Sequence, residues 1–121
     1  MNETFQQGEL KLEARDAGSG PVVTWLGRST ARDPGNFIGP ILGNLYKQAS
    51  ASGKGLVLDF RKLEYMNSST ITPVIRLLHE AKKSGGKVSI VYAAASRWQD
   101  LSFSALTIFA TEDKRIEIRG E

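Results

Sequence analysis

Strand-like apolar runs and segments of helical periodicity alternate along the chain from residue 55 onward. Residues 55–60 and 87–92 are short, largely apolar runs, and the apolar residues between them recur at helical spacing. Further on, a short helix is expected at residues 95–103 and a terminal strand at residues 116–118. Strands that are joined through helices make right-handed crossovers, which keep a sheet largely parallel. The alternation therefore restricts the chain to an α/β fold.

The first third of the chain predicts a hairpin. Leucines alternate with charged residues over residues 9–14, and residues 22–26 form an apolar partner strand. The glycine-rich segment 16–20 between them is typical of a turn. Residues 27–35 are expected to form a polar loop. This hairpin should lie at one side of the sheet.

A helix is expected from Pro40 to about Ser52. Proline suits the first helical position because an amide there has no partner, and Gly53 suits the left-handed conformation that ends a helix. Residues 55–60 predict a central strand buried on both faces. Together these elements predict a single domain over residues 1–121. Its α/β fold has a mixed, mostly parallel sheet, an N-terminal hairpin and helices packed mainly on one face.

The composition excludes several classes of function. Without cysteine the chain has no disulfide, thiolate nucleophile or cysteine-held metal centre, and a single histidine, His79, argues against a metal site. The 16 basic and 13 acidic residues are interspersed, so the net charge of +3 does not predict a nucleic-acid surface. No apolar stretch approaches the roughly 18 residues of a membrane span, and no secretory signal is visible. We expect a cytoplasmic protein without cofactor, nucleic-acid or membrane partner.

The chemically most informative segment is residues 67–70, Asn-Ser-Ser-Thr, which lies between an apolar strand and a helix. Unpaired amides and the dipole at a helix start would stabilise an anion such as phosphate. Regular helix should begin no earlier than about Ser69 or Thr70, because the ring of Pro73 would clash with the Ser69 carbonyl group. That leaves Asn67 and Ser68 exposed before the helix. Two interpretations remain, helix capping and phosphorylation of a hydroxyl.

This segment and its surroundings resemble the STAS domain of bacterial anti-sigma-factor antagonists. In that family a strand ends in Leu-Asp, Asp-Ser-Ser-Gly or Asp-Ser-Thr-Gly opens a helix after a short loop, and Gly-Gly leads into the next strand. The corresponding residues here are Val57-Leu58-Asp59, Tyr65-Met66, Asn67-Ser68-Ser69-Thr70 and Gly85-Gly86-Lys87-Val88. The match covers residues 55–92, and the N-terminal third agrees in element order only.

The resemblance implies a regulatory protein-interaction module that is not an enzyme. The residue that the family phosphorylates corresponds to Ser68, with Ser69 as second choice, and the implied partner surface is Met66, Asn67, Ser68, Ser69 and Thr70. Asn67 stands where the family has Asp, and Thr70 where it has Gly. An Asn-Ser/Thr-Ser loop is similar to a subgroup of STAS-like regulators that switch a diguanylate cyclase. The implied partners are a serine kinase or anti-sigma-factor-like protein, a phosphatase and, for that subgroup, a diguanylate cyclase.

The same residues bear on three other classes of function. A serine hydrolase is excluded because His79 lies about 16 Å from Ser68 along the helix, at 1.5 Å per residue. A nucleotide-binding module remains an alternative, although the segment 18–20 lacks the third glycine of a dinucleotide-binding loop. A constitutive interaction module without phosphorylation is another. Trp25 is expected in the core, and Trp98 either packs on the core or anchors a partner.

Overall fold

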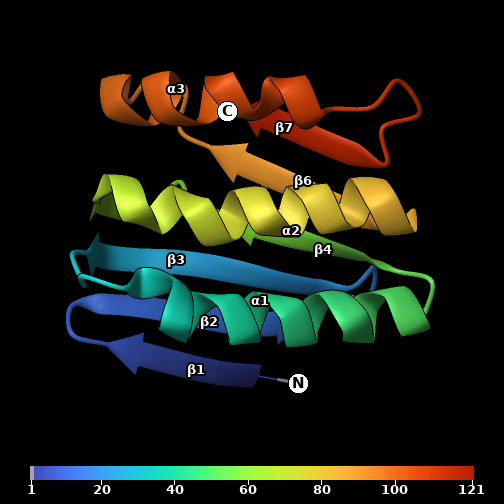
Figure 1. Cartoon of the computed structure of the whole chain (residues 1–121), viewed down its shortest axis with the longest axis horizontal. Helices are drawn as coiled ribbons and strands as arrows, with labels where there is room; N and C mark the ends of the chain where they lie inside the picture. The colour runs from blue at the N-terminus through green and yellow to red at the C-terminus, as the bar shows by residue number, and fades with distance from the viewer. Residues whose placement is uncertain (1) are drawn as a thin grey trace.

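The computed structural model describes residues 2–121 and forms one mixed sheet with helices packed against it (Figure 1). The strands are β1 (Asn2–Gln7), β2 (Leu10–Asp16), β3 (Pro21–Ser29), β4 (Gly55–Asp59), β5 (Leu63–Met66), β6 (Lys87–Tyr92) and β7 (Ile116–Gly120). The α-helices are α1 (Pro34–Ala51), α2 (Ile71–Ser84) and α3 (Arg97–Ser104). Two 3-10 turns, η1 (Ser68–Thr70) and η2 (Ala105–Phe109), precede α2 and follow α3.

The sheet has the strand order β1-β2-β3-β4-β6-β7, and β5 pairs with β3 beside this path. β1 and β3 each pair antiparallel with β2, whereas the paired neighbours from β3 to β7 are parallel. All three α-helices cover the same face of the sheet (Figure 1). The expected α/β architecture is therefore confirmed, including the N-terminal hairpin. No helix within residues 2–121 is both long and apolar enough to cross a membrane.

Two of the strands, β1 and β5, are not predicted by the sequence pattern. β1 is an edge strand that takes its hydrogen bonds from β2, and only Phe5 in it packs against the core. Such a strand needs no apolar face, so its sequence carries no alternation. β5 is four residues long and pairs with Gly27, Arg28 and Ser29 at the end of β3. It is too short for a periodic signal.

The helix α1 begins at Pro34, and the expected start at Pro40 is wrong. The expected loop at residues 27–35 is correspondingly short, because its first residues belong to β3. Pro34 occupies the first helical position for the reason assigned to Pro40, a missing amide that needs no partner there. Pro40 is tolerated inside the helix because it and Asn36, whose carbonyl loses its helical donor, are both exposed to water. At the other end, Gly53 is left-handed as expected, with φ of 68°.

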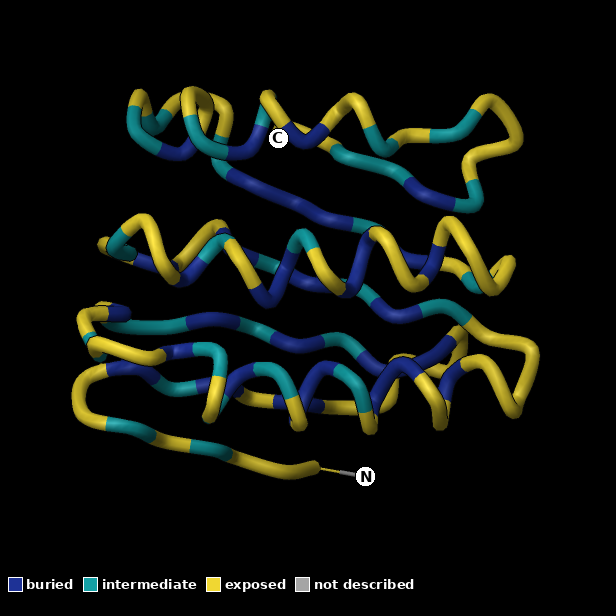
Figure 2. Tube along the Cα trace, in the orientation of Figure 1, coloured by how far each residue is buried: buried dark blue, intermediate teal, exposed yellow. Residues whose placement is uncertain are grey.

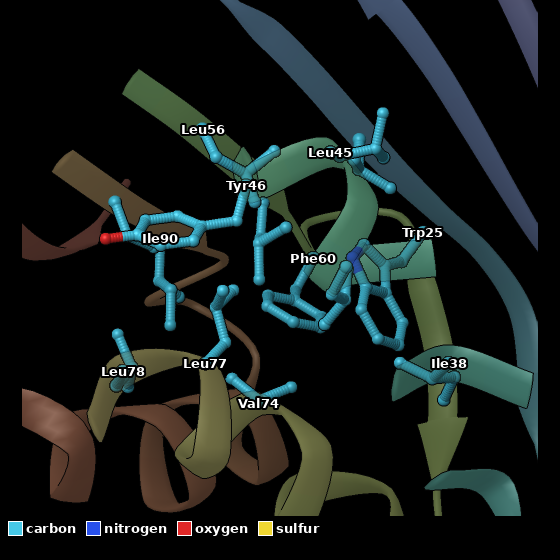
Figure 3. Packing of buried hydrophobic residues seen from close by; sticks show 14 of the residues in the cluster. Trp25, Ile38, Leu45, Tyr46, Leu56, Phe60, Val74, Leu77, Leu78 and Ile90 are labelled. Atoms are coloured by element: carbon cyan, nitrogen blue, oxygen red, sulfur yellow. The ribbon is translucent and has the colours of Figure 1, made fainter. Parts of the chain in front are cut away.

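The core fills the space between the sheet and the three helices. Figure 2 shows buried residues along the sheet-facing side of each helix and at alternate positions of the central strands. Trp25 from β3 lies against Phe60 (Figure 3), and Phe60 lies against Phe103 of α3, with ring centroids 4.5 and 4.4 Å apart. Trp25 is fully buried, as expected. Trp98 is partly buried and packs against this core, with its ring centroid 6.3 Å from that of Phe103.

The strand β4 is buried on one face only, which corrects the expectation of burial on both. Leu56 and Leu58 are fully buried beneath the helices, whereas Gly55, Val57 and Asp59 on the opposite face are partly exposed. The reason is that all helices lie on one side, so nothing within residues 2–121 covers the second face of the sheet. An apolar run with a valine on its open face has the same sequence pattern as a strand buried on both faces.

Gly27 lies where β3 shifts its register against β5. Its φ of 82° is left-handed, and a Cβ there would meet the carbonyl oxygen of Glu9 at 1.9 Å. We expect Gly27→Ala to lower the free energy of unfolding by about 2 kcal/mol or more, because backbone strain and this clash act together. Urea unfolding followed by circular dichroism measures the change.

Gly43→Ala is the matched control. Gly43 lies within α1, where an added Cβ meets open space, so this variant should gain about 0.5–1 kcal/mol from the helix propensity of alanine. Equal stabilities of the two variants would contradict the assignment of Gly27 as a conformational requirement.

Candidate functional site

The loop of residues 67–70 lies at the end of the sheet where β3 and β5 finish and where α1 and α2 begin (Figure 1). Open α/β sheets bind ligands and partners at this carboxyl end of their parallel strands. η1 makes one tight turn and regular helix follows from Ile71, so the limit that Pro73 sets on the helix start is confirmed. The loop is therefore a short, ordered bridge between strand and helix.

Asn67 fixes this loop in place through hydrogen bonds of its side chain and its backbone. Its Oδ1 accepts from the amide and the hydroxyl of Thr70, at 3.2 and 2.8 Å, and its Nδ2 donates to the Ala31 carbonyl oxygen at 2.8 Å. Its own amide donates to the Ser29 carbonyl oxygen at 2.9 Å. An aspartate could keep the cap but has no hydrogen to donate to Ala31. This bond is a structural reason for Asn67 in place of the Asp of the STAS pattern.

Beneath the loop, two buried hydroxyls continue the same network. Ser29 and Thr70 are 1% and 0% exposed, and their hydroxyl oxygens are 2.7 Å apart. Because the single hydroxyl proton of Thr70 goes to Asn67, the hydroxyl of Ser29 must be the donor in this pair. A chain of donors thus runs from Ser29 through Thr70 to Asn67. It links the end of β3 to the start of α2.

The five residues of the implied partner surface fall into three groups. The side chains of Ser68 and Ser69 are exposed, and Met66 and Asn67 are partly buried. Thr70 is fully buried, so it is not part of the accessible surface, and it supports the loop instead. Of the residues 67–70, it is Asn67 that provides a side-chain cap, and the start of α2 has no side-chain cap of its own. Both serine hydroxyls are therefore free to react or to contact a partner.

Gln99 holds the turn between β4 and β5 and was not anticipated from sequence. Its side chain is 1% exposed; Nε2 donates to the carbonyl oxygens of Phe60 and Leu63 at 2.7 and 3.0 Å, and Oε1 accepts from the Ala93 amide at 2.8 Å. The two carbonyl groups of this turn that Gln99 reaches thereby have buried partners. A polar residue in an amphipathic helix gives no sequence signal for such a role.

Asp59 closes the same turn from the open face of the sheet. Its carboxylate accepts hydrogen bonds from the Arg61 amide and guanidinium, the shortest at 2.8 Å, and Arg61 also reaches Glu121 at 3.2 Å. Burial alone would raise the pKa of Asp59. The hydrogen bonds and charge of Arg61, with a smaller effect of Lys62, outweigh burial and lower that pKa below 3.8. Asp59 therefore contributes to the fold near the loop and does not face Ser68 in any contact of the structure.

Comparisons with solved structures identify the fold. A chain in the crystal structure of the diguanylate cyclase SiaD in complex with its activator SiaC, from Pseudomonas aeruginosa, matches with a TM-score of 0.66 and 16% identity over 98% of this chain and 99% of that one. SiaC of Pseudomonas aeruginosa matches with a TM-score of 0.58 and 18% identity over 77% of this chain and 78% of that one. An anti-sigma factor antagonist from Mycobacterium paratuberculosis matches with a TM-score of 0.63 and 14% identity over 92% of this chain and 95% of that one. No family model and no curated protein matches the chain.

These likenesses show that the chain has the STAS-like fold, as the resemblance of residues 55–92 implies. The agreement extends well beyond that segment, since two of the matches cover more than nine-tenths of the chain. At 14–18% identity the likeness is one of fold. The loop described above therefore lies in a fold used by an activator and by an antagonist.

Replacing Asn67 by the aspartate of the STAS pattern tests the role of its side chain. We expect Asn67→Asp to lower the free energy of unfolding by about 1–3 kcal/mol at pH 7, because the Ala31 carbonyl loses its donor and faces a carboxylate. Ser68→Ala is the control, with a change within about 0.5 kcal/mol, since its exposed hydroxyl makes no hydrogen bond that the fold depends on. Urea unfolding of both variants decides the point; an Asn67→Asp protein as stable as wild type would mean that the bond to Ala31 is dispensable.

The ion pair of Asp59 predicts a pH dependence of stability. Because its folded-state pKa is lowered, the ionised carboxylate adds stability above its ordinary pKa of 3.8, and this contribution is lost as the pH falls through the folded value. Asp59→Asn should therefore be less stable than wild type at pH 7, and the gap should narrow below about pH 4. Urea unfolding at neutral and acidic pH measures the gap. If the difference in the free energy of unfolding between Asp59→Asn and wild type does not change with pH, the lost stability comes from packing and not from the ion pair.

Proposed function

We propose that this protein is a phosphorylation-switched regulator that acts by binding another protein. The observation that carries the proposal is the placement of Ser68, an exposed hydroxyl on a loop that Asn67 and the buried Thr70 hold rigid. Modification at this position changes the charge of the surface without breaking a bond of the fold. That Ser68 is the modified residue follows from its position in the STAS-like motif.

The structural neighbours support the regulatory class and suggest the partner. SiaC is named as the activator of the diguanylate cyclase SiaD, and the mycobacterial protein as an anti-sigma factor antagonist. For this chain we propose a diguanylate cyclase or an anti-sigma-factor-like protein as the partner. A serine kinase would transfer the terminal phosphoryl group of a nucleoside triphosphate to the Oγ atom of Ser68, and a phosphatase would remove it. This exchange would take place in a bacterial cytoplasm.

The switch works through the partner and leaves the fold of the protein unchanged. A phosphoserine carries nearly two negative charges and three acceptor oxygens. At Ser68 these are added to an exposed loop, next to the partly buried Met66 and Asn67, so the fold loses no contact. A partner that binds the neutral hydroxyl and the apolar edge of Met66 must instead desolvate or repel a charge. Phosphorylation is therefore expected to release the partner.

The mutant that mimics this state is Ser68→Asp. We expect it to weaken partner binding at least tenfold, corresponding to about 1.4 kcal/mol, while the circular dichroism spectrum and the thermal midpoint stay nearly unchanged. Ser68→Ala should bind like wild type. Affinity capture with each variant as bait, quantified by mass spectrometry, identifies proteins that wild type and Ser68→Ala retain and Ser68→Asp loses.

Ser19→Asp serves as the charge-matched control, since Ser19 is exposed on the β2–β3 turn, outside the loop. Partners lost by this variant too would reflect a general effect of charge. Equal binding by all variants would support the alternative of a constitutive interaction module. If protein from its native cells carries no phosphate on Ser68, the proposed phosphorylation switch is contradicted. Amide shifts of the loop on titration with ATP would instead support the nucleotide-binding alternative.

A further inference from the structure

A polar cleft of about 240 Å³ lies between the starts of α1 and α2, beside the loop. Ser69 lines this cleft, whereas Ser68 does not. On the α2 side, Ser69, Thr72 and Arg76 follow the spacing of one helix face, and on the α1 side the wall includes Arg32. The two adjacent serines therefore face different surroundings.

The cleft carries two guanidinium groups without acidic partners. Within residues 2–121, neither Arg32 nor Arg76 takes part in an ion pair, and both are exposed. Arg76 lines the cleft from α2, and Ser69 lies in η1 just before the N-terminus of that helix. Long side chains in a helix lean toward its N-terminus, which is the end at which Ser69 lies. Asp33 is the one acidic residue that lines the cleft, so the positive charges are in excess there.

We propose that a phosphate on Ser69 binds within this cleft to Arg32 and Arg76, so that Ser69 is a second modification site with an effect distinct from that of Ser68. The inference deepens the proposed function, because it assumes that a kinase acts on this loop. The kinase would transfer the terminal phosphoryl group of a nucleoside triphosphate to Ser69 Oγ, release the nucleoside diphosphate and take up the hydroxyl proton. Arginine is suited to the product because its planar fork matches phosphate oxygens in pairs.

The consequence for the loop is the opposite of that at Ser68. A phosphate on Ser68 adds uncompensated charge to the surface that meets the partner. A phosphate on Ser69 is neutralised within the chain and ties the start of α2 to the start of α1, between which the cleft lies. The first modification alters recognition, whereas the second stiffens the site.

The test places phosphoserine genetically at position 69 or at position 68 of the full chain and titrates each phosphate by phosphorus NMR at low salt. We expect the second pKa of the phosphate at 69 to be about one unit below that at 68, because two cations stabilise its dianion. Arg32→Gln combined with Arg76→Gln should abolish the difference. Asp33→Asn should enlarge it, since Asp33 is the acidic group of the cleft and makes no side-chain cap to α1.

Thermal unfolding provides a second measurement on the same samples. Phosphate at 69 should raise the thermal midpoint relative to the unmodified chain, and the gain should disappear in the double arginine variant and in high salt. Equal pKa values at both positions, unaffected by the arginine substitutions, would overturn the proposal. Neither measurement needs the kinase or the partner, so a failure here is distinguishable from an absent switch at Ser68.

Discussion

A chain of buried hydrogen bonds from Ser29 through Thr70 to Asn67 holds the site together. It joins the end of β3 to the start of α2, two segments some forty residues apart in sequence, and it places both hydroxyls out of reach of water. Groups of this kind are costly to leave unpaired in the core, so the loop has one favoured conformation. The exposed serines are rigid because the residues on either side of them are.

The parts of the fold that could be predicted are those whose signal is local. Alternating leucines in β2, helical spacing in α2 and the proline near its start are each decided within a few residues, and the structure confirms the elements they predict. The start of α1 shows the limit of such signals. Pro34 and Pro40 both suit a first helical position, and the choice depends on which residues the sheet can bury.

The parts that could not be predicted depend on distant partners. β1 and β5 exist because β2 and the far end of β3 offer hydrogen bonds to them, not because of their own hydropathy. The buried pair of Ser29 and Thr70, and the contacts of Gln99 with the β4–β5 turn, are likewise polar residues whose burial only the completed fold makes favourable. The motif at residues 67–70 indicated the candidate site, but the division of its residues into exposed and buried required the structure.

That division gives two adjacent, identical hydroxyls different chemistry. Consecutive residues in a loop point their side chains in different directions. Here the Ser69 side chain lines the cleft, whereas that of the preceding residue, Ser68, does not. The same dianion is expected to be a repulsive group at Ser68 and a bridging group at Ser69, because its effect depends on which charges it meets. In the proposed switch, the effect of a phosphate therefore depends on the two arginines that the starts of α1 and α2 bring to one side of the loop as much as on the serines.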